Sequence, residues 1–179
     1  MSITPSKREN ADRALHNRLV LSSDDLREAR DYALLLVKQP ELERTVRDAL
    51  AAALIVAYGR SFVAGKRGES PDALPALPGR FLRGLTSEMN SLHDRLLLLR
   101  NQEFAHSDGE VASIRLERYQ LNEETFLVPS QRWLRVGLEP DDIERVIAVI
   151  NAIFLKVNSE LADLQQRMAA DDSIPSNRV

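Results

Sequence analysis

The sequence has no cysteine, nine aromatic residues and no long uncharged apolar run. Without cysteine the chain has no disulfide, no thiolate nucleophile and no cysteine-ligated zinc. No segment approaches the roughly 20 apolar residues that a membrane-spanning helix needs. Residues 1–10 are polar and lack the apolar core of a secretory signal. We therefore expect a cytoplasmic protein that does not enter a membrane.

The chain also lacks an excess of positive charge, since 24 Lys and Arg stand against 27 Asp and Glu and the formal net charge is -3. This balance argues against a protein that coats nucleic acid through a bulk positive field. The basic residues are nevertheless unusual, with 20 Arg against 4 Lys. Arginine presents a rigid fork of donors that suits phosphate or carboxylate, although the codon bias of a GC-rich genome explains the same ratio.

The chain contains 27 Leu and 19 Ala among its 179 residues, which favours helices because unbranched side chains lose little rotamer freedom in them. We expect a flexible N-terminal arm over residues 1–22, one mainly helical domain over residues 23–170 and a disordered tail over residues 171–179. The length suits a single domain of ordinary size.

Four helices are expected from apolar periodicity and capping signals. The first begins at Ser23 and stops before Pro40, and Pro40 opens the second. The third begins at Thr86 and the fourth near Pro140. At about 1.5 Å per residue the fourth would reach roughly 45 Å, so we expect one end to project or to pack on a partner chain.

Two segments between these helices differ in character. Residues 65–84 are rich in Gly and Pro and read as a long loop. Residues 111–119 alternate apolar and polar side chains, and residues 125–128 form a short apolar run. These patterns predict a small extended or β-hairpin insert before the last helix.

The third helix changes from a run of leucines to polar residues near Arg100. A polar group on a buried face must be paired or face a cleft, because an unpaired buried charge is costly. One interpretation is an ion-pair network of Arg100 or Arg60 with Asp94 or Glu103. A metal site from His93, Asp94, Glu103 and His106 is a weaker alternative, and we expect neither metal nor cofactor.

The polar segment also carries a motif. Arg100 and Asn101 are followed, after four residues, by His106, and the preceding helix ends in the segment Tyr58-Gly-Arg60-Ser-Phe. This combination resembles the HEPN superfamily, in particular the abortive-infection proteins of the Abi-U type, over roughly residues 24–168.

The resemblance implies a HEPN-like antiparallel four-helix bundle that forms a homodimer and acts as a metal-independent endoribonuclease in toxin–antitoxin or phage-defence systems. RNA and a cognate antitoxin are its implied partners. In the implied site His106 acts as general base or acid, Arg100 holds the scissile phosphate and Asn101 orients the phosphate or the imidazole. The expected substrate-binding residues are Arg60, Tyr58, His93, Lys66 and Arg67.

Helical geometry constrains this reading. Arg100 and His106 are six steps of about 100° apart on a straight helix, so they point about 120° away from each other. A two-fold axis beside this helix would gather both residues from two chains into one cleft. The alternative is a non-catalytic helical dimer that acts as an interaction or nucleotide-binding module.

Overall fold

The computed structural model describes residues 7–64, 74–104, 112–121, 124–133, 138 and 140–170. Within these residues lie four α-helices, one short 3₁₀-helix and two strands. In chain order they are α1 (Lys7–Lys38), α2 (Arg44–Arg60), η1 (Gly79–Leu82), α3 (Ser87–Phe104), β1 (Ala112–Leu121), β2 (Glu124–Trp133) and α4 (Pro140–Ala169).

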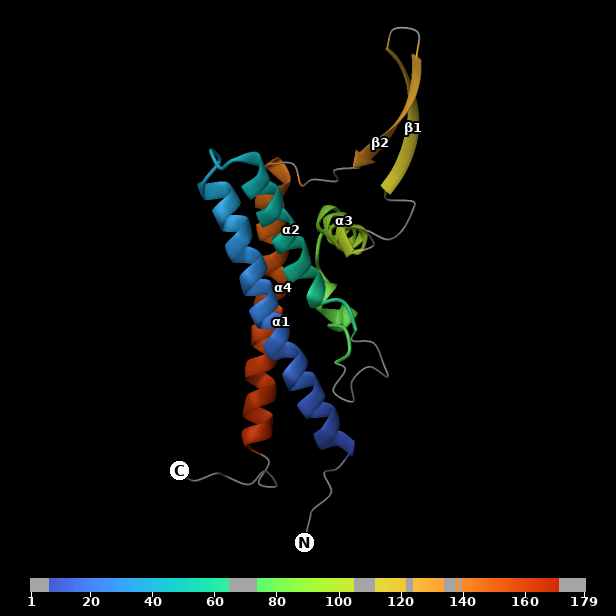
Figure 1. Cartoon of the computed structure of the whole chain (residues 1–179). Coiled ribbons are helices and arrows are strands. Elements are labelled where there is room, and N and C mark those ends of the chain that lie inside the picture. The colour runs from blue at the N-terminus through green and yellow to red at the C-terminus, as the bar shows by residue number, and fades with distance from the viewer. Residues whose placement is uncertain are drawn as a thin grey trace, which may run out of the picture.

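The helices form a bundle in which α1 is central (Figure 1). α1 packs against both α2 and α4 and runs in the opposite direction to each of them. α3 is seen end-on in Figure 1, so it crosses the direction of the other helices, and its main contact is with α2. The mainly helical bundle that the composition predicts is confirmed.

Two strands occupy the region between α3 and α4. β1 and β2 pair antiparallel, with Ala112 opposite Trp133 and Leu121 opposite Glu124. The pair extends away from the helices in Figure 1. In the described part of the chain, no helix is both long enough and apolar enough to cross a bilayer.

The N-terminal boundary differs from our expectation. α1 begins at Lys7 and not at Ser23, so most of residues 1–22 is helix and not a flexible arm. Leu19 and Leu26 are fully buried, and Leu15 packs against the same core. These leucines share one helical face, and burial of that face outweighs the polar composition of the segment.

The same correction accounts for the length of α4. Its C-terminal half packs against the N-terminal half of α1 in the same chain. Leu164 is fully buried, Ser23 Oγ lies 3.0 Å from Asn158 Oδ1, and His16 and Gln165 side-chain nitrogens lie 3.4 Å apart.

Three element boundaries bear on the site. Pro40 does not open α2: Leu42 N–H donates to the Gln39 carbonyl at 3.3 Å and closes a turn there, and α2 begins only at Arg44. α3 begins at Ser87, where the Thr86 hydroxyl accepts the Met89 N–H at 3.2 Å. α4 begins at Pro140 as predicted. Residues 65–73, 105–111 and 171–179, and with them part of the expected loop and the expected tail, lie outside the described residues.

Truncation of Leu19 tests whether the N-terminal half of α1 belongs to the core. Leu19 is fully buried, so Leu19→Ala should lower the free energy of unfolding by about 2–5 kcal/mol through lost burial and a cavity. Urea unfolding followed by circular dichroism measures the change. Leu21→Ala is the matched control, because Leu21 is 48% exposed and should cost far less. Equal effects would show that the segment does not pack.

Candidate functional site

α3 presents His93 and Arg100 to α2. The two residues are seven positions apart, about two helical turns, so they lie on the same face of the helix. Between them, Leu96 and Leu99 are buried in the core, whereas Leu98 on the other side is 56% exposed. One face of α3 is therefore buried in the core. His93 and Arg100 lie near the two ends of this face and both contact α2.

Tyr58 and His93 form the first of these contacts. The Tyr58 hydroxyl and His93 Nδ1 share a hydrogen bond of 2.7 Å. Tyr58 is 0% and His93 5% exposed, and the ring of Phe62 lies edge-on to His93 with centroids 4.6 Å apart. Our expectation that Tyr58 and His93 bind a substrate is therefore corrected, because burial leaves them almost no surface that a substrate could touch.

Burial also sets the protonation of this pair. It lowers the pKa of His93 below its usual value, and the negative charge of Asp94 opposes that shift. Burial raises the pKa of Tyr58, and Asp94 raises it further. Both groups are therefore neutral near pH 7, where an uncharged hydrogen bond holds α2 to α3.

Arg100 forms the second contact. Its aliphatic stem lies directly against the backbone of Gly59, so close that a Cβ on Gly59 would be 2.7 Å from Arg100 Cγ. Arg100 is partly buried and Asn101 is exposed. Arg100 Nη1 donates to Asn101 Oδ1 at 3.1 Å. The structure thus brings together Arg100 and Asn101 of the predicted catalytic residues.

The other predicted residues are placed less directly. His106, Lys66 and Arg67 lie outside the described residues, and their roles stay predictions. Because α3 is described only as far as Phe104, the angular relation of Arg100 to His106 also stays a prediction.

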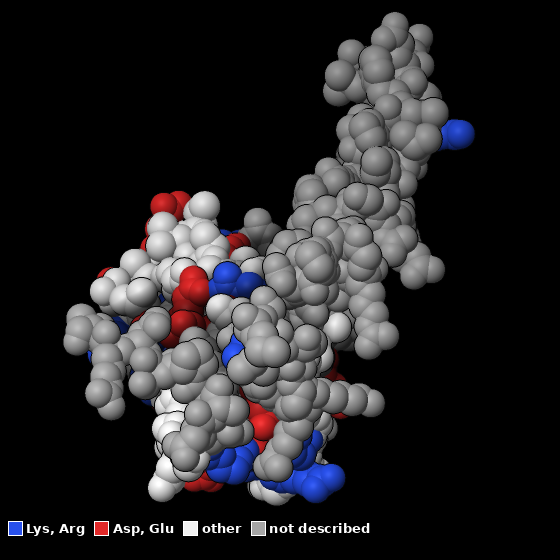
Figure 2. All heavy atoms as spheres, turned by 90° about the horizontal axis from the view of Figure 1, so that it is seen from below, with Lys and Arg blue, Asp and Glu red and all other residues white. Residues whose placement is uncertain are grey.

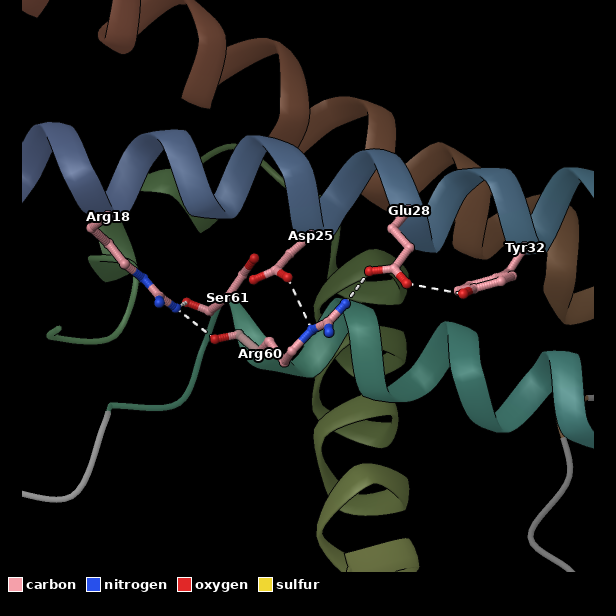
Figure 3. Close-up of polar contacts among 6 residues, drawn as sticks. All are labelled: Arg18, Asp25, Glu28, Tyr32, Arg60 and Ser61. Atoms are coloured by element: carbon pink, nitrogen blue, oxygen red, sulfur yellow. Dashed lines mark hydrogen bonds and ion pairs between the residues drawn. The ribbon is translucent and has the colours of Figure 1, made fainter. Parts of the chain in front are cut away.

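Arg60 lies at the C-terminus of α2 and pairs with α1 (Figure 3). Arg60 Nε is 2.9 Å from Asp25 Oδ1, and Arg60 Nη2 donates to Glu28. The Tyr32 hydroxyl donates to the other oxygen of Glu28 at 2.9 Å. We expected the acidic partner of Arg60 on the third helix, but α1 supplies two, because Asp25 and Glu28 are one turn apart on the face toward α2.

Arg18 completes the polar contacts between α1 and the end of α2. Its guanidinium donates to the carbonyls of Arg60, at 2.6 Å, and of Ser61. These carbonyls are among those that a helix leaves without an intrahelical donor at its C-terminus. Burial lowers the pKa of Arg18, and it raises the pKa of Asp25 against the opposing charges of Arg60 and Arg18. The contacts of Arg18 were not predicted, because Arg18 lies within residues 1–22, which were expected to be a flexible arm.

The described charges on one face of the molecule are of both signs. Figure 2 shows Lys and Arg interspersed with Asp and Glu on the face seen from below, with no extended basic area among the described residues there. Nor do the described residues gather three His, Asp or Glu side chains into a group that could hold a metal ion.

A groove of about 550 Å³ lies between the first halves of α3 and α4. Leu92 and Val149 give it an apolar wall, and Arg95 and Arg145 contribute positive charge. Asp142 accepts from Arg95 Nη1 at 2.7 Å and lies 3.8 Å from Arg145 Nη1. The groove can hold a small molecule with both apolar and charged parts.

Comparison with protein-family models, with curated proteins and with solved structures finds no match to this chain.

The buried Tyr58–His93 pair makes stability depend on pH. Because burial lowers the pKa of His93 in the folded chain, the unfolded chain takes up a proton first as the pH falls. The free energy of unfolding should be level with respect to this group above about pH 6.5 and should decrease as the pH is lowered toward the folded pKa. Urea unfolding between about pH 5 and pH 8 measures this. His93→Gln should lack this component, and an unchanged slope would contradict it.

The Arg60 pairs make a second stability prediction. Arg60→Ala removes the cation that pairs with Asp25 and Glu28, with Arg18 still offsetting part of the charge of Asp25, and should lower the free energy of unfolding by about 1–2 kcal/mol. Arg27→Ala breaks the exposed pair with Asp24 and should cost less than about 0.5 kcal/mol. Urea unfolding measures both changes, and equal stability of Arg60→Ala and Arg27→Ala would contradict the prediction.

Proposed function

We propose that the chain is a metal-independent endoribonuclease of the HEPN type in which Arg100, Asn101 and His106 are the catalytic residues. The observation that carries the proposal is the way Arg100 is held. Gly59 supports its stem and Asn101 lies 3.1 Å from its Nη1, at the boundary between core and solvent. A guanidinium fixed at such a boundary suits a phosphate that arrives from solution.

The reaction follows from the chemistry of the three side chains. An imidazole takes the proton of a ribose 2′-hydroxyl, and the 2′-oxygen attacks the adjacent phosphorus. The bond between phosphorus and the 5′-oxygen breaks, and that oxygen receives a proton from an acid. The products carry a 2′,3′-cyclic phosphate and a 5′-hydroxyl. Arg100 stabilises the charge that develops at phosphorus, and no metal takes part.

The active form is a homodimer in this proposal. On a continuous helix Arg100 and His106 point about 120° apart, so one chain does not direct both at a single phosphate. A two-fold axis beside α3 supplies both residues twice, and one His106 then acts as base while the same residue of the second chain acts as acid.

The substrate is a short stretch of RNA, such as a loop, that needs few phosphate contacts. The formal net charge of -3 supports this choice over long RNA held by many contacts. Lys66 and Arg67 are auxiliary contacts, and Arg60 is a weaker one because two carboxylates compete for it. The protein acts in the cytoplasm as a toxin or phage-defence effector, and an antitoxin would be its further partner.

A second candidate is a non-catalytic helical dimer that binds a nucleotide or a partner protein. The groove between α3 and α4 favours it, since its volume of about 550 Å³ lies within the range of small-molecule sites. Nucleotide binding without RNA cleavage would support this candidate over the first.

RNA cleavage in the presence of EDTA tests the proposal. The full chain should cleave a structured RNA and leave 2′,3′-cyclic phosphate ends. Arg100→Ala should lower the cleavage rate by about 10²–10³-fold through loss of charge stabilisation, and His106→Ala should lower it by about 10²–10⁴-fold through loss of proton transfer.

Arg44→Ala is the matched control, because it also removes one positive charge but from a side chain that is 77% exposed at the start of α2. It should cleave like the unaltered chain. Cleavage that EDTA abolishes, or full activity in Arg100→Ala and His106→Ala, would contradict the proposal. A monomeric mass by light scattering at the assay concentration would contradict the dimeric site.

A further inference from the structure

The crossing of α2 and α3 contains one close approach of a side chain to backbone. A Cβ placed on Gly59 would lie 2.7 Å from Cγ, 3.0 Å from Cδ and 3.2 Å from Cβ of Arg100. Ordinary van der Waals contacts of a Cβ begin near 3.4 Å. The stem of Arg100 therefore occupies the space that any other residue at position 59 would fill.

The backbone does not require glycine at this position. Gly84, with φ of 80°, is the only glycine of the described residues in the left-handed region, so Gly59 has an ordinary helical conformation. Glycine within a helix is unfavourable relative to alanine. Glycine at position 59 is thus explained by the close contact with the Arg100 side chain and not by a turn of the backbone.

Tyr58, the residue before Gly59 in α2, also holds α2 and α3 together. Tyr58 is bonded to His93 at 2.7 Å, two turns before Arg100 on the same face of α3. This hydrogen bond resists sliding and rotation of α3 on α2. The backbone of Gly59, which carries no side chain, lets the C-terminal part of α3 approach α2 closely. These two contacts hold α3, and with it the stem of Arg100, against α2.

We propose that Gly59 is a positioning residue for Arg100, and that it sets the distance of the catalytic guanidinium from the scissile phosphate. This inference rests on the proposed endoribonuclease function. A side chain at position 59 pushes the Arg100 stem away from α2 by on the order of 1 Å. A displacement of this size is enough to impair chemistry while substrate binding persists.

Gly59→Ala tests the inference, with Gly79→Ala as the matched control. A Cβ on Gly79 meets nothing within 4 Å, so the control makes the same chemical change without a contact. Gly59→Ala should lower kcat for RNA cleavage by about 10²-fold and change KM much less. Gly79→Ala should change neither. Unchanged kcat in a folded Gly59→Ala chain would overturn the inference.

A second measurement does not depend on activity. The Nε–H signal of Arg100 in a ¹⁵N–¹H correlation spectrum, assigned by its loss in Arg100→Lys, should move in Gly59→Ala and stay in place in Gly79→Ala. An unmoved signal would overturn the inference even if the rate fell. If the unaltered chain cleaves no RNA, the proposed function fails, and the signal still decides whether Gly59 positions Arg100.

Thermal melting covers the case in which Gly59→Ala folds poorly. The double variant Gly59→Ala/Arg100→Ala removes the stem that the new Cβ meets. Alanine is the better helix former, so the double variant should melt at a higher temperature than Arg100→Ala alone. With Arg100 in place, Gly59→Ala should melt at a lower temperature than the unaltered chain. If Gly59→Ala destabilises the chain equally with and without the Arg100 side chain, the new Cβ clashes with another group, and the inference is overturned.

Discussion

The antiparallel packing of α1 on α4 is the contact that organises this bundle. Along it, Leu19 and Leu26 of α1 and Val157 and Leu164 of α4 are completely removed from solvent. α2 and α3 are added to this pair, α2 through α1 and α3 mainly through α2. Two sets of polar contacts therefore involve α2. One set joins the end of α2 to α1, and the Tyr58–His93 hydrogen bond joins α2 to α3.

Charge and neutrality are divided between those two sets of contacts. On the side toward α1, Arg60 at the end of α2 pairs near the surface with the carboxylates of Asp25 and Glu28 (Figure 3). Arg18 of α1 is 5% exposed and donates to backbone carbonyls at the same end of α2. On the side toward α3, the polar contact at Tyr58 and His93 is neutral and buried. For the Arg60 ion pairs and the Tyr58–His93 bond this division is physically reasonable, since ion pairs tolerate partial exposure while burial favours uncharged partners. Arg18 is the buried exception, and backbone carbonyls accept from its guanidinium.

Much of the helical fold could be predicted from the sequence, because the apolar stripe of α4 and its proline start are local signals. The N-terminal half of α1 could not, because its polar composition hides the few leucines that pack. The partners of Arg60 were missed for the same reason that tertiary contacts usually are: Asp25 is distant in sequence, and spacing along one helix says nothing about the neighbour it faces. Arg100 and Asn101 were predicted from a sequence motif, and their side chains are hydrogen-bonded in the structure, while their catalytic role stays a prediction. The contact of Gly59 with Arg100 has no local sequence signal, because it arises only where α3 crosses α2.

The distance along the chain between the two ends of the main contact has a consequence for biogenesis. His16 meets Gln165 across 149 positions, and Ser23 meets Asn158 across 135. During synthesis α1 leaves the ribosome well before α4, so the leucines of α1 wait without their partner until α4 has been made. Such a nascent helix exposes an amphipathic face to solvent, and the speed of closure is limited by long-range loop formation.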